Sequence, residues 1–285
     1  MIGITGASGK LGSRVLASVR DCLGADNVIG LARIPSNLPG SGRWADFDQP
    51  DSLEVAFAGV ETLLFVASNA PDPARMVQHA AVVAAATAAR VGRVVYTSLV
   101  DCDRRATPVD KMHSATEDLI RRSGMSWTFL RNGEYTENWI NFVSVSEYAT
   151  TGLVRANVGG ARLVSATRDD LAEATATVML GKGHAGKTYD LTGDRLWGFA
   201  ELAAAVERAT SRPVMYRNVS NDEQRRLFQR RGLPAHVVDL MMDVHREIRV
   251  GGFARPATDL TQLLGREPQS MEDAVAAAVG HGESP

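Results

Sequence analysis

The feature that most constrains this chain is a glycine-rich segment near its start, Thr5-Gly6-Ala7-Ser8-Gly9-Lys10-Leu11-Gly12. It follows a short apolar stretch, Met1–Ile4, and leads into a helical pattern with apolar residues on one face. A strand, a glycine turn and a helix in this order predict a dinucleotide-binding unit. We expect Gly6 to form the tight turn, Gly9 to let the backbone approach a pyrophosphate, and Gly12 to let the helix pack closely. The N–H groups at the start of the helix would then hold the phosphates.

The predicted second strand, Asn27–Arg33, ends where a fold of this kind binds the ribose of its cofactor. Units that bind NAD(H) place an acidic residue at this point, about 20 residues beyond the glycines. This strand ends in Arg33, and no aspartate or glutamate stands beside it. Because a guanidinium group offers a planar fork of donors to a phosphate, we predict that Arg33 binds the 2′-phosphate of NADP(H). The alternative is a solvated arginine at a strand end.

The composition is that of an ordinary globular protein, with 45% hydrophobic and 22% charged residues in a chain of 285. A net charge of −2 predicts no general affinity for nucleic acid. No apolar run approaches the roughly 18 residues that a membrane span needs. Cys22 and Cys102 lack the spacing of a metal site, as do the histidines, so we expect reduced thiols and no metal. A strand beginning at residue 2 leaves no room for a signal peptide, so we expect a cytoplasmic protein.

Predicted strands and helices alternate through the first half of the chain, which indicates a parallel sheet covered on both faces. We therefore predict an α/β fold, a Rossmann-type doubly wound parallel sheet with a smaller, mainly helical C-terminal substrate domain. The NADP-binding Rossmann domain should span residues 1–132 and be rejoined by about 161–193, with Lys187–Leu191 as a strand at the sheet edge. Residues 133–160, aromatic and irregular, and residues 194–285 should form the substrate-binding domain.

Individual residues predict where some elements begin and end. Asp48, followed by Pro50, predicts the start of a helix that runs to Ala58. An alanine-rich helix over Arg75–Arg90 is expected to end at Gly92, because glycine commonly terminates helices. In the second half, Arg162–Ser165 is expected to form a single strand.

Motifs along the whole chain match one known family. They are Ile4–Gly12, Leu31–Arg33, Ala45–Asp48, Tyr96–Leu99, His113–Glu117, Thr128–Gly133, Ser165–Arg168 and Gly186–Leu191. By these motifs the chain resembles the NmrA-like atypical short-chain dehydrogenases, and within them the type-2 NADPH:quinone oxidoreductases and the triphenylmethane dye reductases. The resemblance implies that the Rossmann domain binds NADPH. It also implies that a smaller C-terminal domain closes a cleft beside the nicotinamide.

The proton-donating pair of most short-chain dehydrogenases, Tyr-x-x-x-Lys, is absent, because no lysine stands four residues after any of the five tyrosines. The corresponding helix carries His113-x-x-x-Glu117 instead. Exchange between an alcohol and a ketone needs a proton delivered to the alkoxide oxygen. A quinone or a cationic dye needs less help, because it is already electrophilic and its product anion is delocalised. Placement beside the nicotinamide can then supply most of the rate. We therefore expect hydride transfer to a quinone or a similar electrophilic aromatic acceptor.

Three side chains are candidates for contact with that acceptor. His113 is the candidate proton donor because histidine titrates near neutrality; the alternative is a helix residue that makes a structural hydrogen bond. Ser98, at the end of the fifth predicted strand, could bind the substrate or cap a turn. Tyr135, together with Trp139, could line the binding site of a flat aromatic substrate or pack the two domains together.

The remaining candidates would contact the cofactor. The glycine segment from Thr5 to Leu11 would hold the pyrophosphate, and Arg33 the 2′-phosphate. Asp46 and Phe47 would border the adenine, and Asn132, at the end of the sixth predicted strand, would approach the nicotinamide. The residues expected along the ribose and phosphates are Ala67, Ser68 and Asn69.

Two other functions fit the same sequence. NmrA-like proteins include redox-sensing regulators that bind NADP(H) without turnover, and the absence of the Tyr-Lys pair fits such a protein as well. A reductase of a specialised metabolite would use the same hydride step. The match at His113–Glu117 and around Asn132 favours an enzyme over a regulator. The resemblance allows either a monomer or a homodimer.

Overall fold

The computed structural model describes residues 1–71, 73–105, 107–140 and 145–280, and the chain forms two compact units. The first comprises Met1–Asn132, Arg168–Leu191 and Gln262–Gly265, and the second comprises Gly133–Thr167, Thr192–Thr261 and Arg266–Pro285. We expected residues 161–193 to rejoin the first unit. The segment that rejoins it is shorter, Arg168–Leu191, because the strands at 162–163 and 165–166 pair with strands of the second unit.

The first unit is built on a seven-stranded parallel sheet with the order β11-β6-β5-β4-β1-β2-β3. Its strands are β1 (Ile2–Thr5), β2 (Val28–Ala32), β3 (Gly42–Trp44), β4 (Thr62–Phe65), β5 (Arg93–Leu99), β6 (Ser126–Asn132) and β11 (Lys187–Leu191). This sheet confirms the predicted fold class, and β11 lies at the sheet edge beside β6 as expected. The order reverses between β1 and β4. Open sheets of this kind bind ligands at the carboxyl ends of the strands next to such a reversal.

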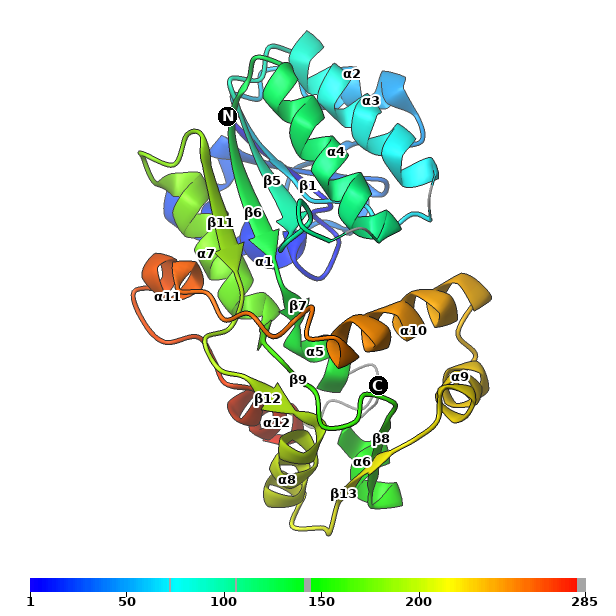
Figure 1. Cartoon of the computed structure of the whole chain (residues 1–285). Coiled ribbons are helices and arrows are strands. Elements are labelled where there is room, and N and C mark those ends of the chain that lie inside the picture. Colours follow the sequence, from blue (N-terminus) through cyan, green and yellow to red (C-terminus); the bar gives the residue numbers. More distant parts are fainter. Residues whose placement is uncertain (72, 106, 141–144, 281–285) are drawn as a thin grey trace. The chain divides into compact units, whose positions relative to one another are not determined.

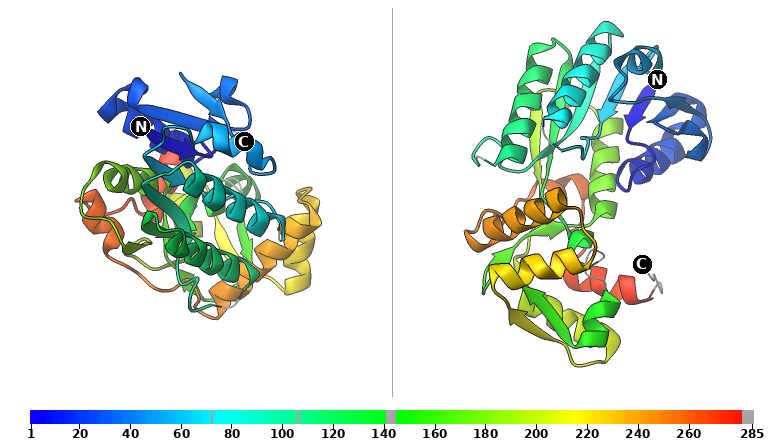
Figure 2. Two further views of the ribbon diagram at one scale, coloured as in Figure 1. Left: turned by 90° about the horizontal axis from the view of Figure 1, so that it is seen from above. Right: turned by 90° about the vertical axis from the view of Figure 1, so that its right-hand side faces the viewer.

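Helices cover both faces of this sheet (Figure 1). Helices α3 (Ala74–Ala88) and α4 (Pro108–Arg122) lie on one face, and α2 (Pro50–Ala56) packs against α3. The other face carries α1 (Gly12–Leu23) and α7 (Arg168–Leu180), as the right-hand view of Figure 2 shows. Between strands and helices lies an apolar core, so the sheet is buried on both faces as its continuous apolar strands require. Short 3-10 helices stand at Ala25–Asn27 and Pro35–Asn37.

Two predicted helix boundaries in the first unit are wrong. Helix α2 is preceded by Gln49 at its N-cap, not by Asp48. The Asp48 carboxylate instead accepts a hydrogen bond of 2.7 Å from the Gln78 amide on α3. Helix α3 does not end at Gly92 either; Arg90 takes the left-handed conformation, with a φ of 57°. The chain can place a non-glycine residue there because the Arg90 and Val91 N–H groups bond to carbonyls of the last helical turn.

The part of the second unit that the structure describes is mainly helical and contains three two-stranded sheets. Its first part, expected to be irregular, contains β7 (Glu134–Tyr135), α5 (Thr136–Ile140), α6 (Val145–Thr151) and β8 (Leu153–Ala156); residues 141–144 lie outside the described chain. The single strand expected at 162–165 is two, because the Val164 N–H turns to the Phe253 carbonyl. The further elements are β9 (Arg162–Leu163), β10 (Ser165–Ala166), β12 (Trp197–Gly198), α8 (Phe199–Thr210), β13 (Met215–Asn218), α9 (Asn221–Arg230), α10 (Ala235–Arg249), α11 (Asp259–Leu264), which runs across the boundary of the two units, and α12 (Met271–Gly280).

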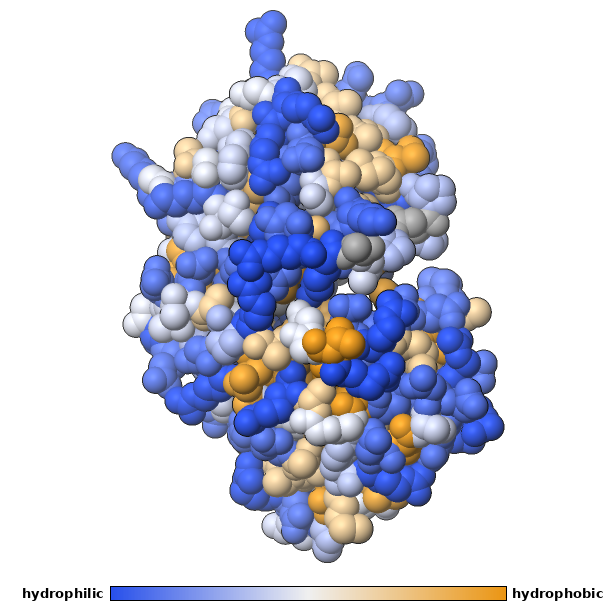
Figure 3. All heavy atoms as spheres, in the orientation of Figure 1, coloured by the Kyte–Doolittle hydropathy of each residue, from blue (hydrophilic) through white to orange (hydrophobic). Residues whose placement is uncertain are grey.

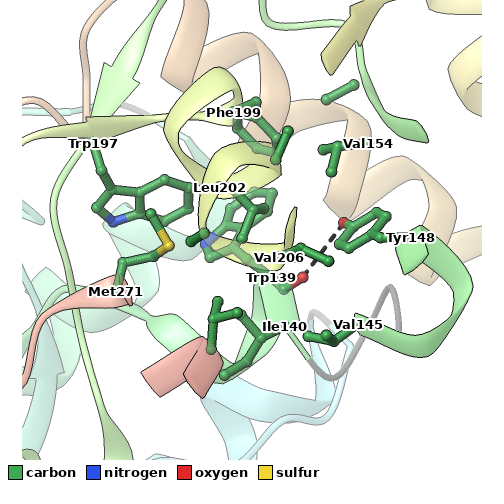
Figure 4. Packing of buried hydrophobic residues seen from close by; sticks show 14 of the residues in the cluster. Trp139, Ile140, Val145, Tyr148, Val154, Trp197, Phe199, Leu202, Val206 and Met271 are labelled. Atoms are coloured by element: carbon green, nitrogen blue, oxygen red, sulfur yellow. Dashed lines mark hydrogen bonds between the residues drawn. The ribbon is translucent and has the colours of Figure 1, made fainter. Parts of the chain in front are cut away.

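An aromatic cluster fills the core of the second unit (Figure 4). The Trp139 ring meets the Trp197 ring edge to face at 6.4 Å between centroids and the Phe199 ring at 5.3 Å. The Tyr148 hydroxyl donates to the Trp139 carbonyl at 3.5 Å. Since Trp139 is only 3% exposed, its ring belongs to the core of this unit and is not free to wall a substrate.

The surface carries mostly hydrophilic residues on the face shown in Figure 3, with hydrophobic ones in small groups. Among the exposed apolar side chains are Val55 and Val77; some apolar exposure is normal for a protein surface. None of the helices in the described part of the chain combines the length and the hydropathy that a transmembrane segment needs.

Candidate active site

The glycine turn between β1 and α1 is held by the end of the neighbouring strand β4. The Thr5 hydroxyl donates to the Leu64 carbonyl at 3.2 Å and accepts a hydrogen bond of 2.9 Å from the Val66 N–H. Thr5 is fully buried, so its side chain joins two strands and does not face a ligand. Gly6 then takes a φ of +60°, and its carbonyl accepts the Gly9 N–H at 2.8 Å. Glycine suits this position because L side chains rarely adopt that conformation.

The start of α1 lies against the same turn. A Cβ on Gly12 would lie 2.2 Å from the Gly6 carbonyl oxygen, so only glycine allows this approach. The backbone hydrogen bonds of the turn engage the N–H groups of Ala7, Gly9, Ser13 and Val15. Within the described chain they leave the N–H groups of Lys10, Leu11 and Gly12 without a backbone acceptor. Successive free N–H groups at a helix N-terminus form a site for an anionic group such as a pyrophosphate.

Arg33 stands at the matching end of the next strand. Thr5 and Leu31 are register partners in the β1–β2 pair, and the Ala7 N–H donates to the Leu31 carbonyl at 3.3 Å. Arg33, two residues further on, is therefore at the same end of the sheet as the glycine turn. Its side chain is exposed and has no hydrogen-bond partner among the residues that the structure describes. The guanidinium is thus free to bind a phosphate beside the turn.

The other predicted cofactor residues lie at the carboxyl ends of neighbouring strands. Asp46 and Phe47 follow β3, and the Phe47 ring packs on Phe65 at 5.8 Å between centroids. Beyond β4, the Ala67 N–H donates to the Thr97 hydroxyl at 2.9 Å, and Asn69 is exposed. Asn132 is the last residue of β6, paired with Leu99 and with Leu191. The structure therefore brings the predicted cofactor residues to one end of one sheet.

Ser68 supports the fit of a dinucleotide to this end of the sheet. Its N–H donates to His79 Nε2 at 3.1 Å, which fixes the segment after β4. Its hydroxyl oxygen is shielded from solvent and lacks a hydrogen-bond partner within the described chain. Buried polar atoms are nearly always satisfied, and a polar ligand at the end of β4 would supply the partner that this hydroxyl lacks. The close approach at Gly12, the exposed Arg33 and this hydroxyl together fit NADP(H).

His113 is buried in a cluster on α4, only 7% exposed. Its Nδ1 lies 2.8 Å from the hydroxyl of Tyr96, which is fully buried on β5. Burial, followed by the charges of His79 and Arg75, lowers the pKa of His113 to about 3. The expectation that His113 titrates near neutrality is therefore wrong. At physiological pH the imidazole is neutral, so it can donate a hydrogen bond but is a weak proton source.

Ser98 lies in β5, and its hydroxyl contacts the side chains of Glu117 and Cys102. It donates to Glu117 Oε1 at 2.7 Å, inside a buried ionic cluster. Arg131 clamps both oxygens of the same carboxylate, at 2.9 Å from Nε and 2.8 Å from Nη2. Burial would raise the pKa of Glu117, but the hydrogen bonds from Arg131 and Ser98 and the charges of Arg131 and Arg121 outweigh it and lower the pKa. Glu117 is therefore an ionised, fully paired carboxylate that fixes the Ser98 side chain.

Tyr135 is the one predicted catalytic residue in the second unit. It lies on β7, half-buried, and its register partner is Ala166 on β10. The structure thus places Tyr135 in a different unit from Ser98 and His113. These two in turn face different partners, since Ser98 bonds to Glu117 and His113 to Tyr96.

Several residues of this region were not predicted from the sequence. His79, Tyr96, Thr97 and Arg131 all hold the candidate residues in place. The sequence gives one indication of this cluster: His113 and Glu117 are four residues apart and so share a helix face. The partners of that face come from other elements and show no pattern in the sequence. Among the described residues, no group of three or more histidine, cysteine or acidic side chains is placed to hold a metal ion.

Comparison with known proteins shows the family of this chain. The model of an NAD(P)H-binding family matches residues 6–180. Quinone oxidoreductase 2 of Escherichia coli (strain K12) is 33% identical over 282 residues, which cover 97% of this chain and 98% of the relative. An NmrA-like family domain-containing oxidoreductase of Aspergillus flavus is 29% identical over 288 residues, covering 95% and 92%. The crystal structure of Citrobacter sp. triphenylmethane reductase complexed with NADP(H) has a TM-score of 0.92 at 31% identity, covering 97% and 99%. The chain therefore belongs to the NAD(P)H-binding, NmrA-like family of oxidoreductases.

Proposed function

We propose that this protein is an NADPH-dependent reductase that transfers a hydride to a quinone or a similar flat, electrophilic aromatic compound. The observation that carries the proposal is which residues stand on the inward face of α4 and how they are hydrogen-bonded. Where a Tyr-Lys pair would deliver a proton, this face carries His113 and Glu117, and internal hydrogen bonds engage both. Neither is a proton donor near neutral pH, because His113 is neutral and Glu117 is ionised. The site therefore suits an acceptor that needs no proton with the hydride.

The residues of the first unit that would hold the cofactor are the glycine turn, Arg33 and Ser68. The N–H groups of residues 10–12 and the positive end of α1 would bind the pyrophosphate. Arg33 would bind the 2′-phosphate and so select NADPH over NADH. Bound NADPH supplies the hydride.

The side chains near the end of β5 would orient the acceptor. His113 presents a neutral imidazole, and Ser98 an oxygen fixed by Glu117, so neither adds a net charge at the site. A quinone gains negative charge on its oxygens as it is reduced, and hydrogen-bond donors stabilise that charge. We propose His113 as such a donor. Tyr135 is proposed as a wall for the acceptor on the second unit.

The relatives support the acceptor class. One is named a quinone oxidoreductase, and another was solved with NADP(H) as a triphenylmethane reductase. A quinone and a triphenylmethane dye share a flat, electrophilic, conjugated system. That shared chemistry is the basis on which we extend the acceptor class to this chain.

The test is oxidation of NADPH by a panel of quinones and a triphenylmethane dye, followed by the loss of nicotinamide absorbance. The proposal expects turnover with at least one quinone and a clear preference for NADPH over NADH. Binding of NADP⁺ and NADPH with similar affinity, without oxidation by any acceptor, would show instead a redox-sensing regulator. Turnover limited to compounds with an isolated ketone would contradict the proposed acceptor class.

A further inference from the structure

A chain of buried hydrogen bonds runs from the segment after β4 to His113. It begins at the Ser68 N–H, which donates to His79 Nε2 at 3.1 Å. A backbone N–H can only donate, so this nitrogen of His79 carries no proton. Burial, followed by the charge of Arg75, lowers the pKa of His79 to about 3, so the ring is neutral at physiological pH. Its single proton therefore lies on Nδ1.

The proton on His79 Nδ1 limits the directions that the next hydrogen bonds can take. This nitrogen lies 3.0 Å from the Thr116 hydroxyl, whose own proton goes to the Met112 carbonyl at 2.9 Å. It also lies 3.5 Å from the Tyr96 hydroxyl. Tyr96 thus faces a protonated nitrogen on one side. On its other side, His113 Nδ1 stands at 2.8 Å, where an unprotonated nitrogen can accept the phenol proton.

We propose that His79 and Tyr96 are positioning residues that hold His113 as a neutral ring with its proton on Nε2. Tyr96 donates to Nδ1 of His113, so the N–H of that ring points away from Tyr96. His79 takes the opposite tautomer, with its proton on Nδ1. The role of this fixed donor rests on the proposed function, in which His113 stabilises charge on the acceptor. The tautomers of His79 and His113 are inferred from the hydrogen bonds and do not depend on the proposed function.

The surroundings favour a fixed arrangement. His79, Tyr96 and Thr116 have no exposed surface, and Phe65 packs on the His79 ring at 4.9 Å between centroids. The rings of Tyr96 and His113 lie 5.8 Å apart. Little water can enter to offer the rings other partners, and hydrogen bonds in such a dry network reinforce one another. The same chain ties the position of His113 to the Ser68 peptide, in the segment proposed to run along the cofactor.

The tautomers can be read directly from the unmodified protein. Long-range ¹H–¹⁵N correlation spectra of the ¹⁵N-histidine-labelled chain distinguish Nδ1–H, Nε2–H and the doubly protonated ring. We expect Nδ1–H for His79 and Nε2–H for His113 at neutral pH, assigned by their loss in His79→Gln and His113→Gln. A His113 ring with its proton on Nδ1, or one that is doubly protonated, would overturn the proposal. This measurement does not require enzymatic activity.

Two variants of His113 separate a donor from a structural partner. In His113→Gln the side-chain amide reaches the Nε2 position and can still donate there. In His113→Asn the amide oxygen stands near the Nδ1 position and can accept from Tyr96, but no group donates at Nε2. We expect His113→Asn to lower kcat on a quinone about ten-fold, with His113→Gln within about three-fold of the parent and KM for NADPH unchanged in both. The reverse order would show that His113 acts only as a partner for Tyr96.

Removal of the phenol hydroxyl tests whether Tyr96 positions His113. Tyr96→Phe keeps the ring in the core and should lower kcat by a few-fold, while the His113 resonances broaden or change tautomer. Unchanged kcat together with unchanged His113 resonances would contradict a positioning role for Tyr96. If the parent chain reduces no quinone at all, the proposed function fails, and the two tautomers alone then decide whether the positioning network exists.

Discussion

At the residue scale, the arrangement of the first unit depends on which polar atoms are already engaged. Thr5, Thr97 and His79 use their side chains to accept hydrogen bonds from the N–H groups of residues 66–68, just after β4. Arg33, by contrast, is exposed and unpaired within the described chain. A free guanidinium and three free N–H groups at the same end of the sheet favour an anionic ligand, which is why we propose this position for the cofactor phosphates.

Arg33→Ala should lower the affinity for NADPH by roughly ten- to a hundred-fold, because one charge-assisted hydrogen bond contributes about 1.5–3 kcal/mol. The affinity for NADH should stay the same, since NADH lacks the 2′-phosphate. Titration of each cofactor by nicotinamide fluorescence measures both values. Arg226→Ala, at an exposed arginine of the second unit, is the matched control. An equal loss for both cofactors would show that Arg33 does not read the 2′-phosphate.

Glu117→Ala should destabilise the protein by about 3–5 kcal/mol, because it removes the main partner of the buried Arg131. Asp118→Ala on the same helix is the control, since Asp118 pairs with Arg121 at the surface and should contribute no more than about 1 kcal/mol. Urea unfolding measures both. A similar small loss in the two variants would show that the Glu117 cluster is not important for stability.

The Glu117 contribution should also depend on pH. Its pKa in the folded protein is below the usual 4.5, so the unfolded chain binds a proton first as the pH falls. The stability difference between parent and Glu117→Gln should be full above about pH 4.5 and shrink as the pH falls through the folded pKa. A difference that grows with acidity would contradict the assigned ionisation.

At the scale of elements, the critical contact is between the start of α1 and the glycine turn. In Gly12→Ala the new Cβ would overlap the Gly6 carbonyl at 2.2 Å, so α1 must move away from β1. We expect a loss of NADPH affinity of at least ten-fold and a lower unfolding free energy by a few kcal/mol. Gly160→Ala is the control, because nothing lies within 4 Å of its added Cβ. Normal cofactor binding by Gly12→Ala would refute the assigned phosphate site.

The elements themselves were largely predictable, because their signals are local. The glycine segment, the apolar runs of β4 and β5 and the edge strand β11 follow from spacing and composition. Gly124, with a φ of +81°, follows α4, as glycine commonly does after a helix. The errors occurred where a distant partner decided the outcome. Asp48 does not cap α2 because Gln78, 30 residues away, binds its carboxylate.

The chemistry of the candidate site was less predictable for the same reason. The low pKa of His113 arises from burial among Tyr96, 17 residues away, and His79 on another helix. The pairing of Glu117 with Arg131 joins α4 to β6. Neither pairing leaves a periodic trace in the sequence. The residues proposed to bind the cofactor could be predicted from a motif, whereas the protonation state of His113 depends on how its side chain is packed.

At the scale of the whole molecule, buried neutral histidines stand in both units. Burial lowers the pKa of His79 and His113 in the first unit, and of His245 in the second, from 6.5 to about 3. Above pH 6.5 the folded and unfolded chains both hold neutral rings. Between pH 6.5 and 3 only the unfolded chain binds these protons, so acid favours unfolding.

We therefore expect the unfolding free energy to fall by roughly 2 kcal/mol per histidine between about pH 7.5 and about pH 5. Denaturant unfolding followed by tryptophan fluorescence reports on both units, through Trp127 in the first and Trp139 in the second. His245→Gln should remove the acid dependence of the second unit alone. Equal stability at both pH values would contradict the neutral state of these rings.

The proposed reaction is hydride transfer from NADPH, bound at the glycine turn, to a quinone-like acceptor. The most direct test is a single-turnover experiment in which the protein, loaded with an equimolar amount of NADPH, is mixed anaerobically with a quinone. We predict that nicotinamide absorbance is lost in one phase. The rate of this phase should be lower with NADPH deuterated at the transferred position. In Arg33→Ala, turnover should be slower and limited by NADPH binding. Tight NADPH binding with no loss of nicotinamide absorbance, for every quinone and dye tried, would contradict the account.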